Sequence, residues 1–202
     1  LLQQRQLLRR HFDAQIAEKD DEGPWLAGQT FAAELARQHQ VNLVAGSIER
    51  WDAAAGARLN TTVVYSRQGQ PLGHYDKRRL FGFERQRHVQ PGSDPLTLQV
   101  EGVSVGVLIC SDLWHPELTR PMAAQAALLC VPAQTTIRPE SEPAYARMLW
   151  HTLAMTRAQE NVLAVVVSDQ AANSQAPFRC GGVSSITDPS AEPVLSDIQR
   201  VL

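Results

Sequence analysis

The sequence predicts a layered α/β fold, and three observations support this. Strand-like segments outnumber helix-like segments, hairpins alternate with strand–helix units, and nearly every predicted strand is apolar throughout. A strand that is apolar on both faces needs cover on both sides, because neither face can be left in water. We therefore predict a sheet packed on a sheet, or a sheet flanked by helices, in a single domain that spans residues 1–202.

Composition narrows the function classes. The chain has 202 residues, of which 44% are hydrophobic and 20% charged, as is ordinary for a globular protein. Its formal net charge of −2, with acids and bases interspersed, favours neither a nucleic acid nor an anionic membrane as partner. No apolar run approaches the roughly 18 residues of a membrane span. The three cysteines are widely spaced without a CxxC pair, which indicates a reducing, cytoplasmic compartment and no structural zinc site.

The first half of the chain predicts two helices followed by strands. Apolar residues recur at helical spacing in residues 1–19 and again from Leu26 to His39. Val41 to Ile48 is typical of a buried strand that ends in small residues. Two extended runs, Asn60–Tyr65 and Pro71–Tyr75, predict a β-hairpin.

The second half predicts alternating strands and helices. Leu96–Val100 and Val103–Ile109 predict a second hairpin, and Gly182–Thr187 a late strand. Pro116 begins a predicted helix to Ala126, which Pro121 could divide into two pieces. Further elements are a strand over Ala127–Val131, a helix over Pro143–Asn161 and a strand over Leu163–Val167. For the long helix we predict an inner face of Tyr145, Met148, Leu149, Leu153 and Thr156.

A candidate nucleophile lies in the stretch GVSVGVLICSDLWHPELTR, residues 102–120. An apolar strand ends at Cys110, a short turn follows, and Pro116 begins a helix. Such an elbow holds a thiol still and leaves backbone N–H groups free to face an oxyanion. Free cysteine is also among the most buried residue types, so a core cysteine is the alternative at this point. Cys130 and Cys180, on or beside apolar strands, are interpreted as structural.

A candidate lysine lies in YDKRRLF, residues 75–81, between an extended segment and a turn. Lys77 is either solvated within a basic run or held beside a thiolate, where it would stabilise negative charge. Glu84, in the following GFERQRHVQPG segment, is a candidate carboxylate partner for it. Arg157 and Glu160, in the RAQEN segment, are typical of a structural ion pair.

Together and in this order, these segments resemble the nitrilase, or carbon–nitrogen hydrolase, superfamily. The matching segments are VAGSI, LNTTVVYSRQGQPLGHYDKRRLF, VQPGSDP, VGVLICSDLWHPELTR, LLCVPAQ, RAQEN and GGVSSITDPSAEP. The specific signal is YxKxxLF paired with an apolar strand that ends in CxD, with the cysteine 33 positions after the lysine.

The resemblance implies a four-layer αββα sandwich that hydrolyses non-peptide C–N bonds in a small linear amide, an N-carbamoyl amine or a nitrile. Cys110 and Lys77 fall on motif positions of the family's Glu-Lys-Cys arrangement, and Glu84 is the candidate for a second glutamate that the family has near the lysine. Cys110 would form a thioester or thioimidate, while Lys77 and the backbone N–H of Ser111 stabilise the developing charge. Ser111 and Thr135 are the candidate substrate-binding residues. The resemblance implies no cofactor and no metal, and a homodimer or larger assembly.

The chain departs from the family pattern at two places. The family's general-base glutamate follows an early strand in a Pro-Glu motif, which is absent here, and Glu18 and Glu22 do not match it. Relative to the family we expect the chain to be incomplete at both ends. The position of the family's second glutamate falls on Arg85, one residue from Glu84. Trp114 and His115 stand where many relatives have Arg-Phe.

Three alternatives stay open. The absent Pro-Glu motif allows a non-catalytic relative that keeps the fold as a binding or assembly module. The FER-R-VQPG segment resembles domains that hydrolyse glutamine amide. A papain-like pair of Cys110 with His88 or His115 is a third, weaker alternative, because no histidine shows an obvious pairing with the cysteine.

Overall fold

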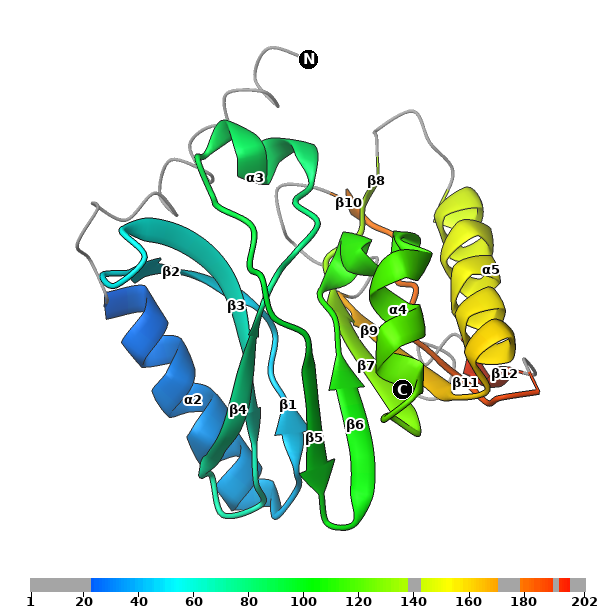
Figure 1. Ribbon diagram of the computed structural model, residues 1–202, viewed down its shortest axis with the longest axis horizontal. Helices are drawn as coiled ribbons and strands as arrows, with labels where there is room; N and C mark the ends of the chain where they lie inside the picture. Colours follow the sequence, from blue (N-terminus) through cyan, green and yellow to red (C-terminus); the bar gives the residue numbers. More distant parts are fainter. Residues whose placement is uncertain (1–22, 138–142, 171–178, 191–192, 197–202) are drawn as a thin grey trace.

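The structure, a computed structural model, describes residues 23–137, 143–170, 179–190 and 193–196. Two β-sheets lie face to face in it, with helix α2 outside one sheet and helices α4 and α5 outside the other (Figure 1). Apolar side chains of both sheets, among them Val64 and Tyr75 from one and Val105 and Val107 from the other, form one core. The four-layer αββα sandwich is therefore confirmed.

The first sheet is antiparallel and presents the lysine segment. Its central strand is β3 (Ala57–Tyr65), which pairs with β1 (Leu43–Val44), β2 (Ile48–Asp52) and β4 (Pro71–Asp76). Helix α2 (Gly23–His39) covers the outer face of this sheet with small residues. Ala32 and Ala36 of the helix pack against Val63 and Tyr65 of the sheet. Lys77 follows the last residue of β4 directly.

The second sheet presents the cysteine. Its strands are, in spatial order, β12 (Pro193–Ser196), β11 (Ser185–Thr187), β9 (Ala164–Asp169), β7 (Leu128–Ala133), β6 (Val103–Val107) and β5 (Leu96–Val100). Strands β6, β7 and β9 are parallel, and their crossovers carry α4 (Pro116–Ala123) and α5 (Pro143–Asn161). The carboxyl ends of parallel strands meet at one edge, where ligands of α/β sheets bind. Cys110 and Gln134 follow two of these ends, and Asp169 closes the third.

Smaller elements complete the described chain. The short helices η1 (Cys110–Trp114) and α3 (Gly82–Gln86) follow β6 and β4, and strands β8 (Thr136–Ile137) and β10 (Arg179–Cys180) pair with each other. No helix in the described part of the chain has both the length and the apolar character needed to cross a bilayer.

Most predicted elements are confirmed, including both hairpins and the helix over residues 143–161. Two details differ. The strand predicted over residues 41–48 is two strands, because the chain leaves the ladder at 45–47 and β2 continues to Asp52. Helix α4 continues through Pro121, which does not divide it. The helix predicted over residues 1–19 lies outside the described residues.

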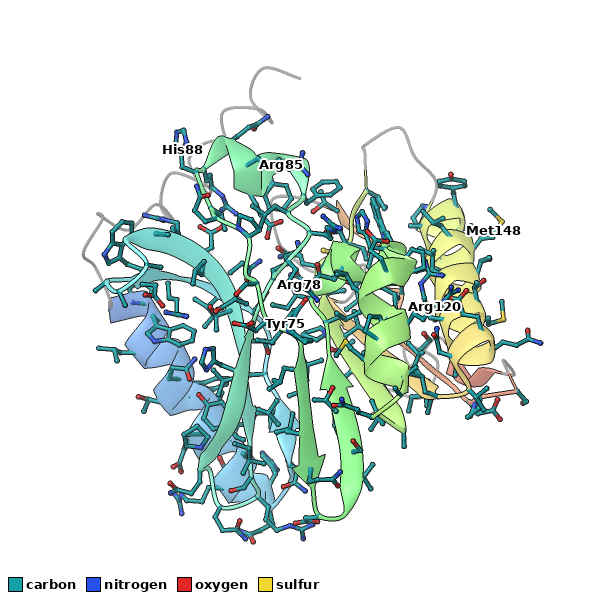
Figure 2. The ribbon with its side chains drawn as sticks, viewed as in Figure 1. Tyr75, Arg78, Arg85, His88, Arg120 and Met148 are labelled. Atoms are coloured by element: carbon teal, nitrogen blue, oxygen red, sulfur yellow. The ribbon has the colours of Figure 1, made fainter. Side chains whose placement is uncertain are left out.

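The predicted inner face of α5 is wrong for most of its residues, although Leu153 packs against the core. Tyr145 and Met148 are both 59% exposed, and Met148 points away from the sheets (Figure 2). The face that packs on the sheet is instead Ala146, Trp150, Ala154, Arg157 and Ala158. Small side chains let the helix approach the sheet closely, so a stripe of large apolar residues does not mark the buried face here.

Candidate active site

Cys110 lies at the elbow between β6 and the helices that follow it. The preceding residues Val107, Leu108 and Ile109 are almost completely buried, which fixes the strand that carries the thiol. Cys110 itself has a φ of 48°, in the left-handed region that residues with a Cβ seldom occupy. The elbow therefore carries local backbone strain of the kind that collects at functional sites.

Asp112 holds the elbow against the lysine segment. Its buried carboxylate accepts hydrogen bonds from the hydroxyl of Tyr75 (2.9 Å), from the N–H of Arg79 (2.7 Å) and from the N–H of Ile109 (3.1 Å). Burial nevertheless raises the pKa of the Asp112 carboxyl, because desolvation outweighs these donors. Tyr75 lies between the two sheets (Figure 2), so its hydroxyl links the YxK segment to the CxD segment.

Arg157 of α5 holds the elbow from the other side. Its Nε donates to the carbonyl of Leu113 at 3.0 Å, and its Nη2 to the carbonyl of Trp114 at 3.2 Å. Its Nη1 donates to Glu160 at 2.9 Å. The structural ion pair predicted in RAQEN is present, and the same arginine also caps the carbonyls of the short helix η1.

Lys77 and Glu84 form a buried ion pair. The two side chains are 3% and 1% exposed, and Lys77 Nζ lies 2.7 Å from Glu84 Oε2. The Glu84 carboxylate also accepts from Asn60 Nδ2 and from the N–H of Phe81, both at 2.6 Å. Helix α3 turns Glu84 inward, whereas the neighbouring Arg85 is exposed on its outer side (Figure 2). The lysine thus contacts the carboxylate of Glu84, although the family's glutamate position falls on Arg85 in the sequence.

Two cavities meet at Cys110. One, of about 550 Å³, is lined by Lys77, Glu84 and Cys110 together with charged residues of the first sheet and some apolar residues, and we call it the polar cavity. The other, of about 350 Å³, is largely aromatic and also contains Lys77 and Cys110 in its wall. The structure therefore brings the candidate lysine, glutamate and cysteine to one place from two sheets. A molecule in either cavity can reach the thiol.

The three thiols differ in their electrostatic surroundings. Burial raises the pKa of Cys110 and the Glu84 carboxylate adds to that increase, while the Lys77 ammonium and backbone hydrogen bonds of Gln134 and Ser111 oppose it. Burial raises the pKa of both Cys130 and Cys180 to about 11, and no cation opposes it there. Of the three, Cys110 is the thiol whose anion has a cation and a backbone N–H beside it.

Similarity to known proteins agrees with this geometry. A sequence model of the family described as Carbon-nitrogen hydrolase matches residues 12–198. The chain belongs to this family. Over 198 residues it is 31% identical to a hydrolase of Mycobacterium tuberculosis, covering 90% of this chain and 66% of that protein. Over 172 residues it is 26% identical to an omega-amidase of Saccharomyces cerevisiae, covering 81% of this chain and 57% of that protein.

Solved structures of the family superpose on the fold. A Saccharomyces cerevisiae member of branch 10 of the nitrilase superfamily gives a TM-score of 0.73 at 26% identity, covering 84% of this chain and 60% of that one. An amidase from Nesterenkonia sp. AN1, which carries an acetamide moiety covalently added at its active-site cysteine, gives 0.70 at 25% identity, covering 84% and 63%. The chain thus spans less than two thirds of the length of each of these relatives.

The remaining predicted site residues fall in different places. Ser111 is buried, and its hydroxyl donates to the carbonyl of Arg79 at 3.0 Å, which leaves its N–H beside the thiol. Thr135 lines the aromatic cavity, but its hydroxyl donates to Asp169 and accepts from the N–H of Gly181. His88 and His115 line neither cavity. Glu18 and Glu22 lie outside the described residues.

Asn60 and Asp169 are site residues that sequence reasoning missed. Asn60 donates to Glu84, and Asp169 accepts from the N–H groups of Thr135 (2.9 Å) and Val183 (3.1 Å). Asp169 ends a largely apolar strand, which was an available signal, whereas Asn60 lies among other polar residues of β3 and gives no such signal. Within the described ranges, no group of three His, Cys, Asp or Glu side chains could hold a metal ion.

Proposed function

We propose that this chain is a thiol-dependent hydrolase of non-peptide C–N bonds in small linear amides, N-carbamoyl amines or nitriles, with Cys110 as its nucleophile. The observation that carries the proposal is the buried Lys77–Glu84 ion pair, which lines the same cavity as a thiol at a strained elbow. Relatives named as an omega-amidase and an N-carbamoylputrescine amidase support the substrate class.

In this mechanism the thiolate of Cys110 attacks the carbonyl carbon of the amide. The C–O double bond opens to an oxyanion, which the Lys77 ammonium and the Ser111 N–H stabilise. Collapse of the oxyanion breaks the C–N bond, the nitrogen leaves as ammonia or amine with the proton that the Cys110 thiol gave up, and a thioester to Cys110 remains. Water then attacks the thioester, which releases the acid and the thiol. With a nitrile, the same attack gives a thioimidate.

Glu84 has a positioning role in this proposal. Its carboxylate already accepts from Lys77 Nζ, from Asn60 Nδ2 and from the N–H of Phe81. Three donors already surround this carboxylate, so its contacts serve to hold the lysine in place. We propose that Glu84 orients Lys77. Thr135 is proposed to bind the substrate as part of the wall of the aromatic cavity.

The same observation favours a second candidate function. If no other group accepts the thiol proton, the chain is a non-catalytic relative that binds small amides without turning them over. The two functions share the nucleophile geometry and differ in the later, proton-dependent steps.

Alkylation and turnover together separate the candidates. Iodoacetamide should label Cys110 faster than Cys130 and Cys180, as read by peptide mass spectrometry, because Lys77 and Ser111 stabilise its thiolate. Faster labelling with ammonia release from an amide supports the hydrolase. Faster labelling without any release supports the non-catalytic relative. Labelling of Cys110 no faster than of Cys130 would remove the basis of both.

We propose a single domain for residues 1–202, and a homodimer that uses α5. Tyr145 and Met148 are large, exposed side chains on that helix, which makes its outer face suitable for a second copy. Light scattering on wild-type protein and on a Met148→Glu variant checks this, because a charge at the interface should shift the dimer toward monomer.

A further inference from the structure

The aromatic cavity beside Cys110 has a wall of rings. Phe81, Phe83, Trp114, Tyr145 and Trp150 line it, and Ile137 and Leu149 add aliphatic surface. The rings of Phe81 and Trp114 lie 5.9 Å apart, edge to face, and those of Trp114 and Trp150 lie 6.1 Å apart. Contacts of this kind hold aromatic side chains in defined orientations. The cavity is therefore a formed apolar pocket.

Hydrogen bonds connect the wall of the aromatic cavity to the segments that carry the proposed catalytic groups. The backbone N–H of Phe81 donates to the Glu84 carboxylate, which in turn contacts Lys77. The carbonyl of Trp114 accepts from Arg157, and Trp114 is the last residue of the short helix that begins with Cys110. The rings at the mouth of the pocket are consequently fixed relative to both the thiol and the lysine.

The two cavities at Cys110 differ in charge. The polar cavity is lined by Glu49, Arg50, Arg58 and Arg87 in addition to the ion pair. Among the described residues that line the aromatic cavity, Lys77 is the one with a charged side chain, and it already contacts Glu84. An acyl group that carries a carboxylate would lose its hydration in the aromatic cavity without a free cation to replace it.

We propose that the aromatic cavity binds the acyl part of the substrate, and that this acyl group is aromatic or otherwise large and uncharged, as in an arylalkanoic amide. The carbonyl carbon then lies at Cys110 Sγ, while the leaving amine and the attacking water use the polar cavity. The inference rests on the proposed function, because it requires Cys110 to be the attacking group. It assigns a substrate class by charge and shape, with Trp114 as a specificity-determining residue.

The test is protection of Cys110 from alkylation, which does not require turnover. The full chain is incubated with iodoacetamide and increasing phenylacetamide, hexanamide, acetamide or succinamate, and the labelling rate of Cys110 is read by mass spectrometry. Phenylacetamide should protect at a concentration roughly tenfold or more below that of acetamide, since even one methylene in an apolar pocket is worth about tenfold. Succinamate, which carries a carboxylate, should protect no better than acetamide.

Two variants locate the effect. Trp114→Ala should raise the protecting concentration of phenylacetamide roughly tenfold and leave that of acetamide nearly unchanged. Phe31→Ala, which removes a 69% exposed ring on α2 far from the cavity, should leave both unchanged. If Trp114→Ala variants are poorly folded, Trp114→Leu keeps an apolar wall and should weaken phenylacetamide protection by a smaller factor.

The outcomes separate the two proposals. Equal protection by acetamide and phenylacetamide, or better protection by succinamate, overturns the aromatic acyl site and leaves the thiol nucleophile intact. A Trp114→Ala variant that changes the oligomeric state but not the protection by phenylacetamide assigns the rings to a protein interface and also overturns it. Slow labelling of Cys110 without any amide contradicts the proposed function itself.

Discussion

Two parts of the site, the lysine side (Lys77 with Glu84) and the cysteine side (Cys110 with the elbow that carries it), are held by different interactions. Lys77 is fixed by a side-chain ion pair that is almost completely buried, and a second donor, Asn60, contacts the same carboxylate. Cys110 is fixed by its backbone, through a buried strand before it and the contacts of Asp112 after it. The difference teaches that the charge beside the thiol depends on a few side chains, whereas the position of the thiol depends on the fold.

Breaking the ion pair should have the largest effect on stability. Glu84→Ala leaves the Lys77 ammonium, the Asn60 amide and the Phe81 N–H without an acceptor in a buried place. Removing one partner of a buried pair costs about 3–5 kcal/mol. We expect urea unfolding to show a loss of that order in the free energy of unfolding.

Two controls sharpen this result. Glu34→Ala breaks an ion pair with Arg37 whose side chains are 55% and 59% exposed, and should cost less than about 1 kcal/mol. The double variant Lys77→Met/Glu84→Met removes both charges and should recover more than half of the loss. A Glu84→Ala variant no less stable than Glu34→Ala would contradict the buried pair.

Loosening the elbow should have a smaller effect. Asp112→Asn replaces one acceptor oxygen with an NH₂ group that faces the donors Tyr75, Arg79 and Ile109. An unsatisfied buried group costs about 1–3 kcal/mol. Because burial raises the pKa of Asp112, the folded state binds its proton more tightly than the unfolded state does, so wild-type stability from this group increases as the pH falls.

The pH dependence of the unfolding free energy checks the direction of the Asp112 pKa shift. The gap in unfolding free energy between wild-type protein and Asp112→Asn should widen as the pH is lowered from neutral toward the ordinary carboxyl range, because the asparagine does not titrate. Urea unfolding at several pH values measures it. A gap that narrows over this range would show that the Asp112 pKa is lowered, and that the donors outweigh desolvation.

The cysteine side was predictable from the sequence and the lysine side only in part. An apolar run that ends in a cysteine and is followed by proline specifies the strand and elbow locally, so Cys110 and its helix α4 could be placed. The partner of Lys77 could not be fixed, because a one-residue difference in a loop separates Glu84 from Arg85. Helix α3, which was not predicted, decides that register by turning Glu84 inward.

The outer helix was predicted in extent but not in orientation. The bounds of α5 follow from its composition, whereas its buried face consists of alanines with Trp150 and Arg157. Arg157 is buried because it caps carbonyls of another element, a contact between residues 43 and 44 positions apart in the chain. The hydropathy pattern of the helix does not predict the burial of an arginine by such a long-range contact.

Removing the charge of Lys77 tests the link between the two sides. The Lys77 ammonium lowers the pKa of Cys110 against the effect of burial. In Lys77→Met the Cys110 pKa should rise, so that less thiolate is present at pH 8 and alkylation by iodoacetamide slows by roughly tenfold. Cys130, whose pKa is about 11 without a cation nearby, is the internal reference.

The reference separates electrostatics from unfolding. A loss of structure would speed the labelling of Cys130 and Cys180 together, whereas a loss of charge slows Cys110 alone. If Cys110 reacts at the wild-type rate in a folded Lys77→Met protein, the lysine does not act on the thiol.

The smallest effect concerns the backbone of the cysteine side. Cys110 has a φ of 48°, which costs a residue with a Cβ about 1–2 kcal/mol and costs glycine little. Cys110→Gly should therefore unfold at a higher urea concentration than Cys110→Ala, with a difference in the free energy of unfolding of about 1 kcal/mol.

At an ordinary helical position alanine is instead more stable than glycine, also by about 1 kcal/mol. Ala124, whose φ of −65° is right-handed, is the matched control, so Ala124→Gly should be destabilising. The opposite order at Cys110 would mean that the elbow is unstrained, and that the thiol is positioned by its side-chain contacts in the same way as the lysine.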